Sequence, residues 1–382
     1  MAAKPTIGLV LTGGGARGAY QAGVLRAIAE RCGRGAPSPF RVVTGVSAGA
    51  INAAFIAANA HDFDYATRHL WDVWEHLQTG DVFRTNPISL SRTGIRLAVE
   101  LSLGAFVPGT RINYLLDTAP LRRLLRKNLE EDAVRDRLAD GTLAALAITA
   151  TNYATGTAVT FYEGAPDVQP WGRSARIGMR ASLGVEHVMA SCALPLFFPP
   201  VRLGDSHYGD GSMRLTAPLS PPIHLGADRL LAIGVRHFRS ADTTRRLNET
   251  TTLTEQPPIA QVGGALLNAV FLDSLETDLE RAMRINDTLS HIPDARRRSQ
   301  SLRPMPLVAL RPSRDLGALA KELLSSFSLP VRHLLRGIGA SRSTGSDLLS
   351  YLAFVNRYTE QLLRLGYQDG QDSAAELDAL LA

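Results

Sequence analysis

A serine lies between two glycines where a short apolar run meets a stretch rich in small residues. The pentapeptide is Gly45-Val46-Ser47-Ala48-Gly49, with Val42-Val43 before it and the alanine-rich stretch 50–58 after it. Between a strand and a helix, flanking glycines permit a tight turn that holds the serine in a strained conformation with its hydroxyl exposed. The first N–H groups of the helix and its dipole point to the same place, where they would stabilise a developing oxyanion. The pattern predicts a nucleophile at Ser47, while a serine that only caps the helix is the alternative.

A glycine-rich loop precedes this serine. Gly13-Gly14-Gly15-Ala16-Arg17-Gly18 follows a strand predicted over residues 6–11 and leads into a helix predicted over 19–31. The spacing fits a dinucleotide-binding turn, but that turn needs an acidic residue at the end of the next strand, which ends instead in the serine turn. The other interpretation is an oxyanion hole, in which bare backbone N–H groups face an intermediate at Ser47. Because neighbouring parallel strands bring both loops to one edge of the sheet, we favour the oxyanion hole.

The side chain of Arg17 within this loop has two interpretations. It could add a positive charge beside the developing oxyanion. It could equally form an ion pair that anchors the loop to the rest of the protein. The sequence leaves both roles open.

A carboxylate stands in a similar setting further along the chain. Asp210 lies between Gly209 and Gly211 and is followed by Ser212. The glycines let the backbone approach closely and orient the carboxylate, which would take the Ser47 proton directly as a general base. Asp-Gly is also a common turn dipeptide, which is the plainer interpretation. A triad would need a histidine, but none has both the context and the chain order of α/β-hydrolases, and we expect loop or core positions for His187, His207, His224 and His237.

The elements that would position these residues alternate between strands and helices. The other strands are expected at 143–151, 157–162, 230–235 and 306–310, the first two as a hairpin. Helices are expected at 50–58, 63–77, 120–129, 133–138, 185–193, 259–289, 316–327, 331–338 and 347–365, with a loop over 240–258. This order predicts an α/β fold, a three-layer sandwich with a mostly parallel central sheet. Residues 95–107 are apolar with few charges, which indicates either a lid over the site or a packed helix.

Composition and charge are those of an ordinary globular protein. The 382 residues are 45% hydrophobic and 20% charged, with a net charge of +5 scattered along the chain. The positive charge weakly favours anionic membranes, and its scatter argues against nucleic acid as a partner. Cys32 and Cys192 suit a reducing compartment, and neither lies in a motif that binds metal. No signal-peptide pattern and no apolar stretch of about twenty residues occurs, so we expect a cytoplasmic protein without a metal or cofactor.

Two further motifs complete a set of four that occurs in one order over residues 5–238. Ala190-Ser191-Cys192-Ala193-Leu194-Pro195 is one, and Asp210-Gly211-Ser212 is the other. With the glycine loop 13–18 and the pentapeptide 45–49, they resemble the patatin-like phospholipase family of the bacterial type. The loop is similar to that family's oxyanion loop, the pentapeptide to its nucleophile elbow, and 190–195 to its Ala-Ser-x-x-x-Pro segment. The departure is Ser212, because the family usually has Gly or Ala after Asp-Gly.

The resemblance implies a Ser47–Asp210 dyad, without a histidine, that hydrolyses acyl esters of lipids through an acyl-enzyme. It implies a phospholipase or lysophospholipase whose substrate is a phospholipid or another lipid ester, and which docks transiently to a membrane surface. A transacylase with the same dyad and a non-catalytic interaction protein on the same scaffold are the alternatives. We expect residues 5–238 to form the catalytic domain and 239–382 a mostly helical extension packed on the same fold, without chemistry of its own. The sequence carries no signal for the oligomeric state.

Overall fold

The structure is a computed structural model that describes most of the chain. The described residues are 5–84, 114–130, 132–166, 168–238, 240–250, 256–271, 273–293, 302–321, 323, 332 and 346–382. The predicted apolar segment 95–107 lies outside them, as do most of the helix predicted over 331–338 and the end of the one predicted over 316–327.

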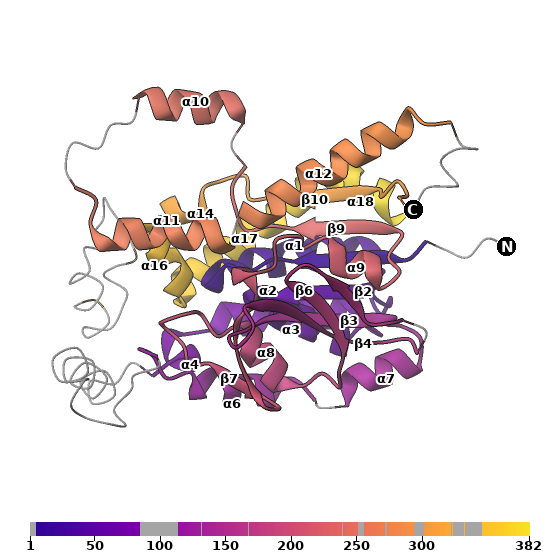
Figure 1. The fold of residues 1–382 in the computed structure, drawn as a ribbon, viewed down its shortest axis with the longest axis horizontal. Coiled ribbons are helices and arrows are strands. Elements are labelled where there is room, and N and C mark those ends of the chain that lie inside the picture. The colour runs from indigo at the N-terminus through magenta and orange to yellow at the C-terminus, as the bar shows by residue number, and fades with distance from the viewer. Residues whose placement is uncertain are drawn as a thin grey trace.

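A mixed β-sheet forms the middle of the molecule (Figure 1). Among the described residues it has ten strands in the order β10-β9-β1-β2-β3-β4-β6-β5, with β8 paired to β3 and β7 paired to β8. The strands β10, β9, β1, β2 and β3 run parallel, whereas β4 and β8 run antiparallel to β3. The predicted α/β class and the predicted hairpin of β3 with β4 are therefore confirmed. The strand bounds are β1 (Ile7–Leu11), β2 (Phe40–Val46), β3 (Ala145–Asn152), β4 (Thr157–Gly164), β5 (Trp171–Arg173), β6 (Arg176–Arg180), β7 (Val201–Leu203), β8 (Ser206–Asp210), β9 (Arg229–Ile233) and β10 (Leu307–Leu310).

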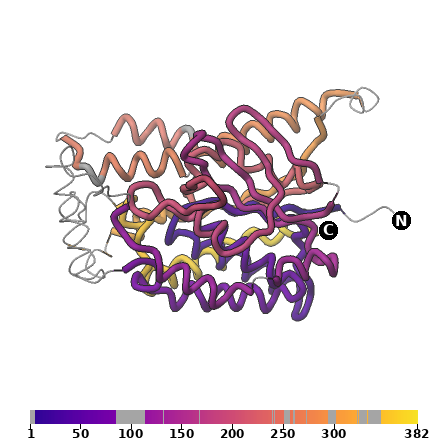
Figure 2. Tube along the Cα trace, turned by 60° about the horizontal axis from the view of Figure 1, so that its bottom comes forward, coloured from indigo at the N-terminus to yellow at the C-terminus, as the bar shows by residue number. Residues whose placement is uncertain are grey.

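Helices cover both faces of this sheet (Figure 2). One face packs on α1 (Gly18–Cys32), α2 (Ala48–Ala58), α3 (Phe63–His76) and α17 (Asn356–Asp372), and the other on α9 (Ser220–His224) and α12 (Asp273–Ser290). Successive side chains of a strand point to opposite faces. In β1, Leu9 and Leu11 accordingly join the core on the α1 side, and Val10 joins the core on the α12 side. The arrangement is a three-layer sandwich whose central strand is buried on both faces.

The described part of the chain contains further helices. They are α4 (Thr79–Val82), α6 (Ala119–Asn128), α7 (Ala133–Ala139), α8 (Val185–Ser191), α10 (Ala241–Thr250), α11 (Ile259–Phe271), α14 (Leu316–Leu319), α16 (Ser346–Leu352) and α18 (Ala374–Leu381). Two short 3-10 turns, η1 (Gly15–Arg17) and η2 (Gly211–Met213), follow β1 and β8. The helix predicted over 347–365 is divided at residues 353–355 into α16 and α17, and the one predicted over 259–289 is described as α11 and α12 on either side of residue 272.

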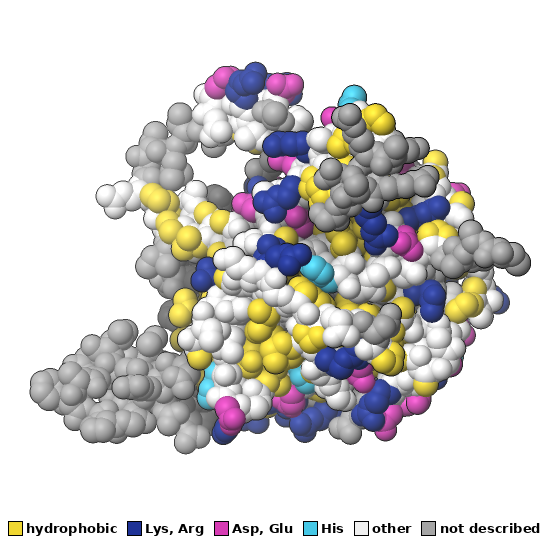
Figure 3. All heavy atoms as spheres, turned by 45° about the vertical axis from the view of Figure 1, so that its right-hand side comes forward, with side chains coloured by type: hydrophobic (Ala, Val, Ile, Leu, Met, Phe, Trp, Pro, Cys, Tyr) yellow, Lys and Arg dark blue, Asp and Glu magenta, His cyan; other side chains and the backbone are white. Residues whose placement is uncertain are grey.

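The loop predicted over 240–258 is wrong in part, because it contains α10. This helix is polar and largely exposed, with acidic and basic side chains on its outer surface (Figure 3). Ser240 accepts a hydrogen bond from the N–H of Thr243 (3.2 Å), and Asp242 pairs with Arg245 at 3.7 Å. A capping hydrogen bond and an ion pair between side chains one turn apart therefore stabilise this helix locally. The spacing of apolar residues in the sequence therefore does not predict a polar helix of this kind.

The C-terminal helix α17 lies directly against α1. A Cβ on Gly366 would meet the Tyr20 carbonyl oxygen, and a Cβ on Gly23 would meet the Leu363 carbonyl oxygen. The two backbones thus touch where both helices carry glycine. Tyr20 also donates a buried hydrogen bond to Asp369 (3.0 Å). Close backbone packing and a buried polar contact join the two helices, although the division into a catalytic domain and an extension stays a prediction.

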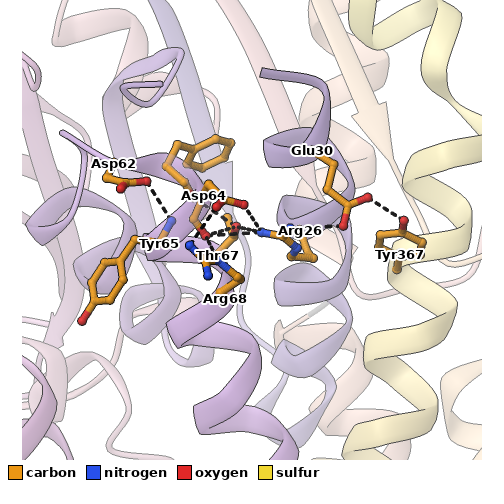
Figure 4. Close-up of polar contacts among 9 residues, drawn as sticks. Arg26, Glu30, Asp62, Asp64, Tyr65, Thr67, Arg68 and Tyr367 are labelled. Carbon is orange, nitrogen blue, oxygen red and sulfur yellow. Dashed lines mark hydrogen bonds and ion pairs between the residues drawn. The ribbon is translucent and has the colours of Figure 1, made fainter. Parts of the chain in front are cut away.

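Polar contacts extend this packing to α3, as Figure 4 shows. The guanidinium of Arg26 in α1 donates to Asp64 of α3 (2.7 Å). Glu30, one turn further along α1, accepts a hydrogen bond from the Tyr367 hydroxyl of α17 (2.6 Å). The three helices are therefore held as one layer by side chains as well as by apolar contacts.

Replacing Gly366 by alanine tests this packing. The new methyl group would push α17 away from α1, and we expect the free energy of unfolding to fall by about 2 kcal/mol or more, as in overpacked cores. Gly263 is the matched control, since it is also a helix glycine but a Cβ there meets no atom within 4 Å. Gly263→Ala should raise the stability by up to about 1 kcal/mol. Urea titration followed by circular dichroism measures both, and equal effects would contradict the close packing.

Candidate functional site

Ser47 occupies the sharp turn between β2 and α2. Its backbone has φ 55° and ψ −130°, a conformation that an L-residue rarely adopts. A Cβ on Gly45 would meet the Gly49 carbonyl oxygen, and a Cβ on Gly49 would meet the carbonyl oxygens of Leu11 and Thr12. Only glycine fits at either position, because backbone from β1 and α2 comes too close. The strained turn expected from the sequence is present, and α2 begins at the next residue.

Asp210 is the last residue of β8 and lies fully buried. Its backbone N–H donates to the Ala193 carbonyl (2.9 Å), and its carbonyl accepts from the Thr151 hydroxyl (2.8 Å). The neighbouring glycines again allow close contacts, since a Cβ on Gly209 would meet the Tyr153 hydroxyl and one on Gly211 the Thr149 carbonyl. The carboxylate is thereby held at a fixed place beside the serine turn.

Burial is the main influence on this carboxylate. It raises the pKa of Asp210 to about 7, although the Ser47 hydroxyl and the N–H and hydroxyl of Ser212 act in the opposite direction. Asp210 Oδ1 accepts the Ser212 N–H at 2.9 Å. Oδ2 accepts no hydrogen bond from the described residues, even though the Ser47 hydroxyl is near enough to affect the pKa.

Residues at the C-terminal end of α8 form hydrogen bonds with the backbone of the serine turn. Ser191 Oγ accepts the Ser47 N–H (2.8 Å) and donates to the Thr149 carbonyl (2.7 Å). The Cys192 thiol donates to the Ser47 carbonyl (3.0 Å). These contacts explain the Ala-Ser segment physically, since Ser191 ties the strained backbone of Ser47 to β3. The sequence marked this segment only through the family resemblance.

The glycine loop runs past the same serine. A Cβ on Gly13 would meet the Ser47 Cβ and the Ser212 Oγ, so the loop and the two serine side chains meet there. Gly15 has φ 59°, and a Cβ there would meet the Tyr351 carbonyl oxygen. A Cβ on Gly14 would meet the Val235 side chain. These glycines are therefore needed for packing against the protein itself, whether or not their N–H groups hold an oxyanion. Alanine at Gly14 or Gly15 does not isolate an oxyanion hole.

Arg17 turns away from the serine toward the C-terminal part of the chain. Its guanidinium donates to Ser350 (2.9 and 2.7 Å) and to Asp347 (3.0 Å), and lies 4.7 Å from the centre of the Tyr351 ring. The side chain is buried, so the guanidinium depends on these partners to offset its loss of water. Of the two roles left open by the sequence, the geometry matches the ion pair that anchors the loop.

An apolar pocket opens beside Ser47. The empty space there is about 700 Å³ when the open solvent at the mouth is counted, and most of the lining residues are aliphatic or aromatic. Helices α2, α3 and α6 form one side. Phe271, Tyr351, Leu352 and Phe354 from the C-terminal part form another. The sequence analysis missed these four residues, because an apolar residue that lines a pocket has the same pattern as one in a core.

The histidines make contacts elsewhere. His187 packs on the Phe161 ring at 5.0 Å, His224 stacks on Trp171 at 4.9 Å, and His237 bonds to the Pro312 carbonyl at 2.8 Å. In the part of the chain that the structure describes, no group of His, Cys, Asp and Glu side chains could hold a metal ion. Within the same residues, no helix is both long and apolar enough to cross a bilayer.

Comparison with solved structures gives several matches at low sequence identity. VipD from Legionella pneumophila is 15% identical with a TM-score of 0.32, and the match covers 94% of this chain and 67% of that one. The Pseudomonas aeruginosa type III effector ExoU is 13% identical with a TM-score of 0.35, covering 99% and 53%. Human GIVD cytosolic phospholipase A2 is 14% identical with a TM-score of 0.39, covering 99% and 59%. The chain thus spans between about half and two thirds of the length of these structures.

Comparison with curated protein sequences finds no match. The model of the family described as patatin-like phospholipase matches residues 9–223, which is more than half of the chain. This range contains the glycine loop, the serine turn, the Ala-Ser segment and Asp210. The resemblance drawn from the four motifs is confirmed, and the chain belongs to the patatin-like phospholipase family.

Proposed function

We propose that this chain is a serine lipid acyl hydrolase of the phospholipase or lysophospholipase type, with Ser47 as nucleophile and Asp210 as general base. One observation carries the proposal: a strained serine stands between a fully buried carboxylate and an apolar pocket. A serine that served only as a helix cap would need neither neighbour. Membership of a lipid-hydrolysing family supports the reaction class.

The proposed reaction begins when Ser47 Oγ attacks the acyl carbonyl of the substrate. Asp210 takes the hydroxyl proton and returns it to the leaving alcohol, which leaves an acyl-enzyme that water then hydrolyses. A base works best when its pKa lies near the working pH, and burial brings the pKa of Asp210 to about 7. An ordinary aspartate would be a much weaker base, so the loss of solvent around Asp210 is part of the mechanism.

Charge on the substrate oxygen would be stabilised by backbone groups. The first N–H groups of α2 have no partner within the helix, and the glycine loop passes beside Ser47 from the other side. Arg17 supports this arrangement indirectly, since it fixes the loop to α16. We infer that the oxyanion is held by backbone N–H groups and that the guanidinium holds the loop in place.

The apolar pocket would receive the acyl chain. Hydrocarbon buried against apolar side chains gains free energy roughly in proportion to the area removed from water. Since Ser47 lies on the pocket wall, an acyl chain within the pocket would present its carbonyl to the serine, and a polar head group would stay outside. This favours a lipid ester over a small polar ester as the natural substrate.

Contact with a lipid surface is a further proposal. Three exposed apolar side chains repeat every four residues on α11: Val262, Leu266 and Val270. Figure 3 shows apolar side chains gathered on this projecting helix, on the left of the view. The helix carries no charge, and its last residue, Phe271, lines the pocket. An apolar helix face of this kind would enter the boundary region of a bilayer beside the pocket.

Two substitutions test the dyad. Ser47→Ala should give a folded protein with no esterase activity on p-nitrophenyl butyrate and no covalent adduct with a fluorophosphonate probe. Asp210→Asn should lower kcat/KM by roughly 10²–10⁴-fold, the usual range for a general base. Mass spectrometry locates the adduct, and thermal unfolding checks that each variant is folded.

Histidine variants are the control for the dyad. His187→Gln and His207→Gln should change kcat/KM little, because neither histidine contacts Ser47 or Asp210 in the described structure. A probe adduct at another serine in Ser47→Ala would show that the nucleophile is misassigned. A loss in either histidine variant equal to that of Asp210→Asn would show a triad.

Leu266→Asp tests the lipid-facing helix. A charge on the exposed face of α11 would oppose entry into a bilayer. Because Leu266 would no longer be buried in the bilayer on docking, hydrolysis of vesicle phospholipid should fall by about tenfold or more. Met283→Asp on α12 is the matched control, since both side chains are 62% exposed. The short soluble ester should be hydrolysed equally by both variants. If Leu266→Asp affects the two substrates equally, α11 does not dock to lipid.

A further inference from the structure

We propose that Ser212 is a positioning residue for the catalytic base, with its hydroxyl donating to Asp210 Oδ2 while its N–H holds Oδ1. The inference rests on the proposed function, because it assigns Asp210 the role of base. It concerns the one position where the chain departs from the Asp-Gly-Gly or Asp-Gly-Ala that its family resemblance leads us to expect.

Two buried polar atoms without partners lie in this part of the site. Among the described residues, Asp210 Oδ2 and Ser212 Oγ accept or donate no hydrogen bond, although both residues are buried. A buried polar atom without a partner costs free energy, so such atoms in a native protein usually have a function or a missing partner. Here an acceptor and a donor stand two residues apart on one turn.

A hydrogen bond from the Ser212 backbone already fixes the position of the Asp210 carboxylate relative to Ser212. The Ser212 N–H donates to Asp210 Oδ1 at 2.9 Å, which fixes the carboxylate over the start of η2. The Ser212 hydroxyl is also near enough to the carboxylate to affect its pKa, and a hydroxyl can turn about the Cα–Cβ bond toward an acceptor. Ser212 would bind both oxygens of the carboxylate, one with its N–H and one with its hydroxyl.

The position of Ser212 relative to Ser47 makes this contact useful. A Cβ on Gly13 would meet both the Ser212 Oγ and the Ser47 Cβ, so the two serines flank the glycine loop at the same point. A carboxylate held by Ser212 could not rotate away from Ser47. In the reaction the proton moves from Ser47 Oγ to Asp210 Oδ2, and Ser212 keeps its own proton throughout.

The charged state of the base should depend on the same hydroxyl. A hydrogen bond to the ionised form stabilises that form, and the Ser212 hydroxyl acts to lower the pKa of Asp210. Among the described residues, the titratable groups from other elements that interact with Asp210 are Tyr153, Cys192 and Tyr351. Burial raises the pKa of each, so all three are neutral between pH 6 and pH 8. Apart from the proposed nucleophile Ser47, Ser212 is therefore a group whose removal should change the titration of Asp210 without removing a charge.

The pH profile of Ser212→Ala tests the proposal. A hydrogen bond to a charged group corresponds to about one pKa unit, so the lower limb of kcat/KM against pH should move up by about one unit. For p-nitrophenyl butyrate at pH 6, kcat/KM of Ser212→Ala should be about tenfold below that of wild type. The difference between the two proteins should shrink as the pH rises. Ser212→Thr, which keeps the hydroxyl, should retain the wild-type midpoint. Ser206→Ala, on the same hairpin, is the control and should match wild type.

A loss in Ser212→Ala that is equal at every pH would overturn the proposal, because it would mean a purely structural role. A profile identical to that of wild type would also overturn it. Wild-type protein that is inactive on soluble and lipid esters alike would count against the proposed function instead, and the role of Ser212 can still be measured without substrate.

Stability against pH provides that second measurement. The folded-state pKa of Asp210 is raised above its unfolded value, so ionisation opposes folding and stability falls between about pH 4 and pH 7 before it levels off. The contribution of Asp210 is the difference in unfolding free energy between Asp210→Asn and its parent at each pH. In the Ser212→Ala background, this difference in unfolding free energy should level off at a pH about one unit higher than in the wild-type background. An unchanged midpoint in that background would refute the contact.

Discussion

The site depends on one constraint, the close approach of the backbones of β1, β2 and α2 around Gly45 and Gly49. The end of β1 contacts the start of α2 so closely that no side chain fits at Gly49, and α2 turns back on β2 so closely that none fits at Gly45. This contact forces Ser47 into its rare backbone conformation and brings the loop after β1 alongside it. Backbone strain of about 1–3 kcal/mol persists only where surrounding structure enforces it. Here the Ser47 N–H donates to Ser191 Oγ and the Ser47 carbonyl accepts from the Cys192 thiol, and these two hydrogen bonds help to hold the conformation.

The C-terminal part of the chain contributes more than additional helices. Residues beyond the family match of 9–223 line the pocket at Phe271 and Tyr351, and they supply both hydrogen-bonding partners of Arg17. A buried guanidinium without partners is strongly destabilising, so the glycine loop and α16 should be stable only together. The expectation that this region has no chemistry of its own stays a prediction. Its side chains nevertheless form part of the wall beside the proposed nucleophile.

The sequence predicts those features that depend on neighbouring residues. The glycines around Ser47 and Asp210 indicate close backbone approach, and the alternation of strands and helices indicates the layered sheet. Features that depend on distant partners could not be predicted in this way. Arg17 meets Asp347 only after the fold has brought together residues 330 positions apart. Likewise, nothing in the apolar pattern of α16 distinguishes Tyr351 on a pocket wall from a residue in a core, and α10 depends on polar contacts rather than on apolar spacing.

A crystal structure of the protein inactivated by a long-chain alkyl fluorophosphonate would test the central claim, that Ser47, the glycine loop and the apolar pocket form one active site. The account predicts a phosphorus bonded to Ser47 Oγ, and a phosphoryl oxygen about 2.7–3.1 Å from backbone N–H groups of the glycine loop or the start of α2. The alkyl chain should lie in the pocket between Phe55 and Tyr351. An adduct on another residue, or an alkyl chain that leaves the pocket empty, would contradict it.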